Sequence, residues 1–102
     1  MIHVIATVKL KPGCRDRYLE ILKSNVANVK AEAGCLVYEP TVDMQTDIEI
    51  HEPAGDDAVT IVEAWQSVEA LKEHFQAPHM LSYREKAKDL FDSVSIRVLK
   101  PA

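Results

Sequence analysis

Four residues near the middle of the chain are of types that can bind and deprotonate an organic molecule. Glu63 and Trp65 lie two positions apart in a stretch rich in Val, Ile and Thr, and His74 and His79 follow in a helical stretch. Residues two apart in a strand share a face, so the carboxylate and the indole should point the same way. A carboxylate buried in such a strand would have a raised pKa and could act as a base or pair with a histidine.

Three further side chains could complete a small-molecule site. Asn25 falls in the middle of the apolar stripe of the first helical segment, where a buried amide without partners costs about 1–3 kcal/mol. Asn25 therefore either bonds a nearby backbone group or orients a bound oxygen atom. Tyr38 offers a flat surface for an aromatic ligand. Tyr83 lies four positions after His79, which places the two side chains in contact on a helix.

These residues also have structural interpretations. Glu63 could be exposed, or could form an ion pair with Arg84 at the edge of the last helix's apolar stripe. His74 lies about 100° from the centre of its helix's apolar face on a helical wheel, which favours a structural role. Core packing is the ordinary role of Tyr38 and Trp65. The cluster as a whole supports a chemical role better than any one of its members.

No metal or nucleotide motif accompanies the cluster. Asp47, Glu49 and His51 alternate and could face one cation, but a short acidic strand beside a turn is more typical of a solvated sheet edge. The three glycines of the chain do not form a phosphate-binding loop. Cys14 and Cys35 lack the spacing of a metal-binding pair. We therefore expect a site without metal, nucleotide or flavin.

The distribution of charge argues against a nucleic-acid partner. The net charge is −4, and ten of the sixteen acidic residues fall between Lys30 and Lys72, where there is no Lys or Arg. No apolar run approaches the roughly 20 residues of a membrane helix, and the N-terminal residues do not resemble a signal peptide. With Cys14 and Cys35 as free thiols, we expect a cytoplasmic protein that forms a single domain over residues 1–102.

Hydrophobic periodicity predicts the order β-α-β-(β)-β-α-α-β. The predicted strands are residues 2–10, 36–43, 47–52, 58–65 and 93–99, and the predicted helices are residues 15–33, 67–76 and 78–91. This order favours an α+β, ferredoxin-like βαββαβ fold with the helices on one face of an antiparallel sheet. Ile5 and Ile61 suggest that the other face is partly apolar, and a second copy of the sheet would cover it in a homodimer.

Three segments resemble the antibiotic-biosynthesis-monooxygenase (ABM) superfamily, and the small bacterial quinol monooxygenases most closely. They are Glu-Ala-Gly-Cys35-Leu-Val-Tyr38, Glu63-Ala-Trp65-Gln-Ser-Val-Glu-Ala-Leu and Pro78-His79-Met80. The resemblance implies a dimeric α+β barrel. It also implies oxygenation of a hydroquinone or related phenol by O2 without a cofactor. A deprotonated substrate of this kind is electron-rich enough to pass an electron to O2 directly.

The resemblance also suggests roles for the residues. We expect His74 or His79 to be the base, with Glu63 as its orienter. The expected substrate-binding residues are Asn25, Tyr38, Trp65 and Tyr83.

Other activities occur among similar proteins. Haem-degrading relatives carry Asn, Trp and His where this chain has Thr7, His74 and Arg84, so haem degradation is disfavoured. Isomerisation of a small phosphorylated signal molecule stays as an alternative, although few basic groups lie near the cluster. A non-catalytic dimer that binds a small aromatic molecule would use the same pocket.

Overall fold

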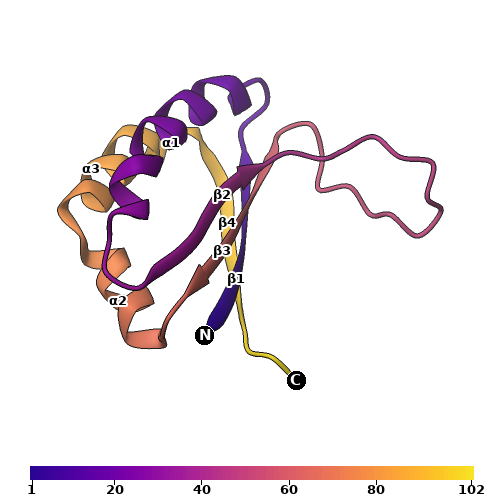
Figure 1. Cartoon of the computed structure of the whole chain (residues 1–102). Helices are drawn as coiled ribbons and strands as arrows, with labels where there is room; N and C mark the ends of the chain where they lie inside the picture. Colours follow the sequence, from indigo (N-terminus) through magenta and orange to yellow (C-terminus); the bar gives the residue numbers. More distant parts are fainter.

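In the computed structural model, which describes all 102 residues, three helices cover one face of a four-stranded antiparallel sheet (Figure 1). The strands are β1 (Ile2–Leu10), β2 (Cys35–Thr41), β3 (Ala58–Trp65) and β4 (Phe91–Leu99), and the helices are α1 (Arg15–Lys30), α2 (Val68–Gln76) and α3 (Pro78–Ala87), followed by a 3-10 turn, η1 (Lys88–Leu90). The strand order is β2-β3-β1-β4. The predicted α+β, ferredoxin-like fold is confirmed. No helix is long and apolar enough to cross a membrane.

Local signals in the sequence set the helix boundaries around the later histidines. The Ser67 hydroxyl accepts a hydrogen bond from the Ala70 N–H at 3.1 Å, so Ser67 caps α2 as its residue type predicts. Ala77 is extended (φ −62°, ψ 141°), and Pro78 begins α3. The first helix ends at Lys30 rather than at residue 33 as predicted, because the chain turns there before Gly34.

The register of the sheet decides which strand residues face the helices. Alternate residues of β1, including Val4 and Ala6, are buried in the core. Ala6 pairs with Ile61, which is therefore also in the core, whereas Ile5 pairs with Val62 on the opposite face. The prediction that Ile61 lies on the uncovered face is wrong. A stretch of alternating apolar residues does not reveal which set faces inward.

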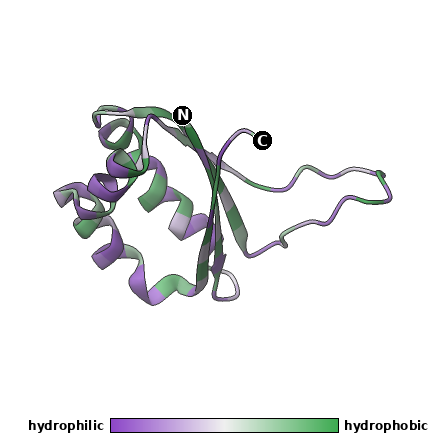
Figure 2. Ribbon diagram, turned by 90° about the horizontal axis from the view of Figure 1, so that it is seen from below, coloured by the Kyte–Doolittle hydropathy of each residue, from purple (hydrophilic) through white to green (hydrophobic).

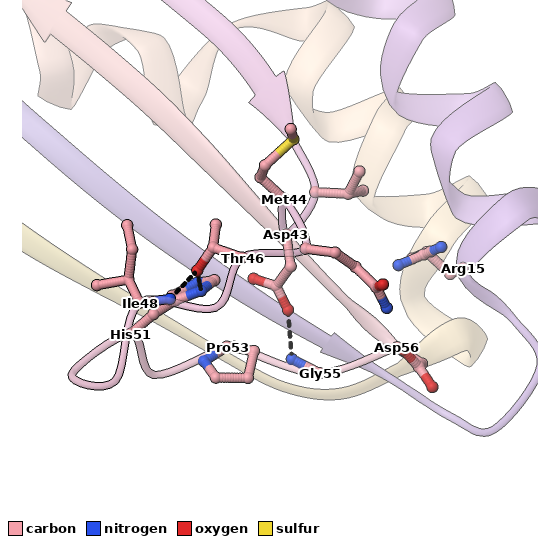
Figure 3. Close-up of a pocket in the computed structure, with 11 residues that line it drawn as sticks. Arg15, Asp43, Met44, Thr46, Ile48, His51, Pro53, Gly55 and Asp56 are labelled. Atoms are coloured by element: carbon pink, nitrogen blue, oxygen red, sulfur yellow. Dashed lines mark hydrogen bonds between the residues drawn. The ribbon is translucent and has the colours of Figure 1, made fainter.

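The segment at 42–57 is a long loop that projects on the side of the sheet away from the helices (Figures 1 and 2). The prediction of a strand at 47–52 is wrong: this segment pairs with no other strand, and alternation alone cannot supply the hydrogen bonds of a ladder. The base of the loop is closed by Asp43, whose carboxylate accepts a hydrogen bond from the Ala54 N–H at 3.1 Å and another from the Gly55 N–H at 2.9 Å. Figure 3 shows the bond to Gly55.

Candidate functional site

A cavity of about 250 Å³ lies between the sheet and the helices α2 and α3. Its walls are mainly apolar side chains from β1, β3 and β4. The lining residues that carry a polar or ionisable group are Tyr38, Glu63, His74, Tyr83 and Arg84. Four of the seven predicted site residues therefore line one cavity within a single chain.

Glu63 and Trp65 point the same way, as expected for residues two apart in a strand, and the structure places both on the side of the helices. The indole Nε1–H of Trp65 donates a hydrogen bond to Glu63 Oε1 at 2.9 Å, and the two residues are only 0% and 5% exposed respectively. Burial raises the pKa of Glu63 from its usual 4.5 to about 7, and the indole N–H partly opposes this rise. Trp65 does not line the cavity. Its ring lies behind His74, with ring centroids 4.7 Å apart.

His74 is buried at the centre of this group, with 2% of its surface exposed. Its ring packs against those of Trp65 and Tyr38, which come from β3 and β2. The helical wheel underestimated this burial because it counts only neighbours on the same helix. Burial lowers the pKa of His74, so the imidazole is neutral at pH 7.

The carboxylate that orients His74 is Glu32, not Glu63 as predicted. Glu32 Oε2 lies 2.8 Å from His74 Nδ1 and 2.8 Å from His79 Nε2. Glu32 stands in the turn after α1, inside the Glu-Ala-Gly-Cys segment that marks the resemblance. Nothing in its spacing from the histidines, 42 and 47 residues away, indicated the contact.

Gly34 allows this turn to approach α2 closely enough for Glu32 to reach the histidines. Its φ is +86°, a region that other residues rarely adopt, and a Cβ there would lie 2.7 Å from the Ala70 Cβ. The backbone of the turn at Gly34 therefore packs directly against the Ala70 side chain of α2, and a larger residue at position 34 would not fit. The position of Glu32 follows from this contact.

Apart from the guanidinium of Arg84, three side-chain polar atoms of the cavity residues have no hydrogen-bond partner in the chain: Glu63 Oε2, the Tyr38 hydroxyl and His74 Nε2. No fully buried polar side-chain atom in the molecule lacks a partner, so each of these three keeps some accessible surface. An ionised carboxylate only accepts hydrogen bonds. His74 Nδ1 therefore carries the hydrogen that it donates to Glu32, and Nε2 has a free lone pair.

Two predicted site residues lie elsewhere. His79 and Asn25 line a separate polar cleft of about 100 Å³ between α1 and α3. Asn25 Nδ2 donates to Met80 Sδ at 3.4 Å, and its oxygen accepts from Asn28 Nδ2 at 3.2 Å. The amide is thus satisfied by side chains, which neither interpretation from the sequence anticipated. His79 is 24% exposed and reaches the His74 site only through Glu32.

Tyr83 and Arg84 form hydrogen bonds with residues other than those considered from the sequence. The Tyr83 hydroxyl is hydrogen-bonded to the Tyr18 hydroxyl. Arg84 makes no ion pair with Glu63 and instead donates to the Phe75 carbonyl oxygen. The largest hollow, of about 680 Å³, lies along the 42–57 loop and contains none of the predicted site residues (Figure 3). No group of three metal-ligating side chains is present.

The arrangement can bind and deprotonate a small aromatic alcohol. An imidazole that lines an apolar cavity, with a free lone pair on one nitrogen and a carboxylate bonded to the other, can act as a general base whose charged state is stabilised. The Tyr38 hydroxyl can donate a hydrogen bond to an oxygen anion as it forms, and the Glu63 carboxyl group can do so in its protonated form.

Comparison with known proteins identifies the family of the chain. Residues 1–86 match the family model described as Antibiotic biosynthesis monooxygenase. The chain belongs to this family. YgiN of Escherichia coli K12, named a probable quinol monooxygenase, is 34% identical over 99% of this chain and 98% of its own length. This ABM-family chain is also similar in structure to PA3566 of Pseudomonas aeruginosa, with a TM-score of 0.81 and 27% identity over 99% of this chain and 93% of that one. The structure of Rv0793 from Mycobacterium tuberculosis is also similar, with a TM-score of 0.80 and 26% identity. The match covers 99% of this chain and 92% of that one.

Proposed function

We propose that this protein is a cofactor-independent monooxygenase that oxidises a hydroquinone or a related phenol with O2. In the overall reaction, a quinol and O2 give a hydroxylated quinone and water. One oxygen atom enters the ring and the other leaves as water. The observation that carries the proposal is the Glu32–His74 pair: His74 lines a mainly apolar cavity, and its Nε2 has no hydrogen-bond partner in the chain. Membership of the ABM family and the similarity to YgiN support it.

The first step is removal of a hydroxyl proton by His74 Nε2. Glu32 stabilises the imidazolium that results, because its oxygen already accepts the Nδ1–H at 2.8 Å. The apolar walls keep water from solvating the substrate anion, and the Tyr38 hydroxyl can donate a hydrogen bond to it. The anion then transfers an electron to O2, and the two radicals combine on a ring carbon. His74 returns its proton to the peroxide, and the O–O bond then breaks: water leaves with the hydrogen of the same ring carbon, which becomes a carbonyl carbon.

We further propose that the protein acts as a single-domain homodimer in the cytoplasm. The sheet face away from the helices carries half-exposed apolar side chains, among them Val37 (41% exposed), Val62 (38%) and Leu99 (37%). A second copy would bury this face. Cys14 and Cys35 are free, which fits a reducing compartment. Sedimentation at several protein concentrations tests the dimer.

Oxygen consumption by metal-stripped protein tests the reaction. The substrates are reduced naphthoquinones and catechols, and the background is their spontaneous autoxidation. We expect uptake above background, and a loss of about 100-fold or more in His74→Ala, since a positioned base contributes roughly 10²–10⁴. His51→Ala, in the 42–57 loop, is the matched control and should retain full activity. Undiminished turnover in His74→Ala would overturn the assignment of the base.

A further inference from the structure

One cation lines the cavity, and no acidic side chain in the chain neutralises it. Arg84, from α3, is half-buried, and it takes part in none of the ion pairs of the molecule. A guanidinium has five N–H donors. The only side-chain hydrogen bond that Arg84 makes is the one to the Phe75 carbonyl oxygen. Its other donors are free to bind a ligand.

Arg84 lies at the open side of the cavity. Phe75, Val94 and Ile96 also line the cavity, and they are 37%, 53% and 42% exposed. The hydrogen bond to Phe75 therefore holds the guanidinium at this accessible rim. Arg84 and His74 line the same cavity, and the positive charge of Arg84 adds to the effect of burial in lowering the pKa of His74. One ligand could thus reach both Arg84 and His74.

The charges at the two ends of the cavity differ in sign. Glu63 lies inside, where its carboxyl group would repel a second carboxylate but can hydrogen-bond a hydroxyl group. Arg84 lies at the rim, where its planar fork matches a carboxylate in geometry and charge. A phosphate dianion would call for more than this one cation, and a neutral quinol would leave the guanidinium without a partner.

We propose that the substrate is an aromatic hydroxy acid, with its hydroxyl group toward His74 and Glu63 and its carboxylate on Arg84. The cavity of about 250 Å³ is smaller than the roughly 300–1,000 Å³ of pockets for drug-sized ligands, so the ring system is small. This inference rests on the proposed function and specifies its substrate class. Arg84 is the residue that selects the acid over the uncharged phenol.

Binding under anaerobic conditions tests this inference without turnover. The probes are 6-hydroxy-2-naphthoate and 2-naphthol, which differ in the carboxylate, titrated by calorimetry at pH 8. We expect wild-type protein to bind the acid at least tenfold more tightly than the phenol, and Arg84→Gln to lose this preference while it binds 2-naphthol normally. Lys86→Gln removes a charge two residues away on α3, outside the cavity, and should keep the preference.

Retained binding of 2-naphthol by Arg84→Gln shows that the cavity is intact in the variant. Equal affinity of wild-type protein for the two probes, no binding of either, or equal weakening of both by Arg84→Gln would overturn the inference. Failure of the proposed function gives a different result: selective binding of the acid, with no oxygen uptake when the corresponding dihydroxy acids are supplied in air.

Discussion

The buried carboxyl group of Glu63 makes a specific contribution to the pH dependence of stability. Replacement by Gln removes the titration and keeps an oxygen that can accept the Trp65 N–H. In the wild-type protein the pKa of Glu63 rises from 4.5 to about 7 on folding. Between these values the folded state holds a proton that the unfolded state has released. The free energy of unfolding therefore falls as the pH rises through this range.

The size of the effect follows from the pKa values. At about 1.4 kcal/mol per pKa unit, the difference between 4.5 and about 7 amounts to about 3 kcal/mol in full. Part of it is already lost at pH 5, which leaves about 2–3 kcal/mol between pH 5 and pH 8. As the pH rises from 5 to 8, the free energy of unfolding of Glu63→Gln should therefore increase by about 2–3 kcal/mol relative to that of wild type. The burial of Glu63, at 5% exposure, justifies the use of the full shift.

Urea unfolding measures this difference. Trp65 is the only tryptophan and is fully buried, so its fluorescence reports the transition directly. The lowered pKa of His74 acts in the opposite direction, because stability from a neutral buried histidine is lost as the pH falls. That contribution is common to both proteins and cancels in their difference. Protein concentration is held constant, since association would shift the midpoints.

Glu39→Gln is the matched control, because Glu39 is an exposed carboxylate on the neighbouring strand. Between pH 5 and pH 8 its free energy of unfolding should change relative to wild type by less than about 0.5 kcal/mol, as is usual for substitutions at exposed sites. A difference between Glu63→Gln and wild type that is the same at pH 5 and pH 8 would refute the account. It would mean that Glu63 is ionised throughout the range, and that the cavity is wetter than its walls suggest.

Three further predictions concern the elements that position the site. Gly34→Ala should lower the free energy of unfolding by about 2–4 kcal/mol, since it combines a strained φ with a Cβ 2.7 Å from Ala70; urea unfolding measures this, and wild-type stability would contradict it. Ser67→Ala should cost about 1 kcal/mol in the same assay through loss of the α2 cap, and an unchanged midpoint would show the cap to be replaceable. Glu32→Gln should shift the hydrogen of neutral His74 away from Nδ1 in ¹⁵N NMR spectra and lower turnover with little loss of folding; an unchanged tautomer would contradict the orienting role.

The fold was predictable because its signals are local and agree with one another. Alternation in β1, the cap at Ser67 and the break before Pro78 each fix one element, and the element order then restricts the topology. The strand predicted at 47–52 failed because pairing is not local: a segment with the right alternation stays a loop when no neighbouring strand bonds to it.

The site was only partly predictable. Glu63 and Trp65 share a face by strand geometry alone, which the sequence predicted, whereas the hydrogen bond between them is seen only in the structure. Glu32 joins the histidines through packing of the Gly34 turn on α2, a tertiary contact without a periodic signal. Asn25 stood out as a polar residue in an apolar stripe, but sequence could not say which of the neighbouring helices would satisfy it.

The central claim is that the protein inserts one atom of O2 into a phenolic ring, with His74 as the base. The most direct test is turnover of a dihydroxyarene under ¹⁸O2 by metal-stripped protein, with mass spectrometry of the product. We predict one labelled oxygen atom per product molecule, formed faster than by autoxidation, and loss of this excess in His74→Ala. The claim would be contradicted if labelled product formed no faster than by autoxidation, or if wild type and His74→Ala formed it at the same rate.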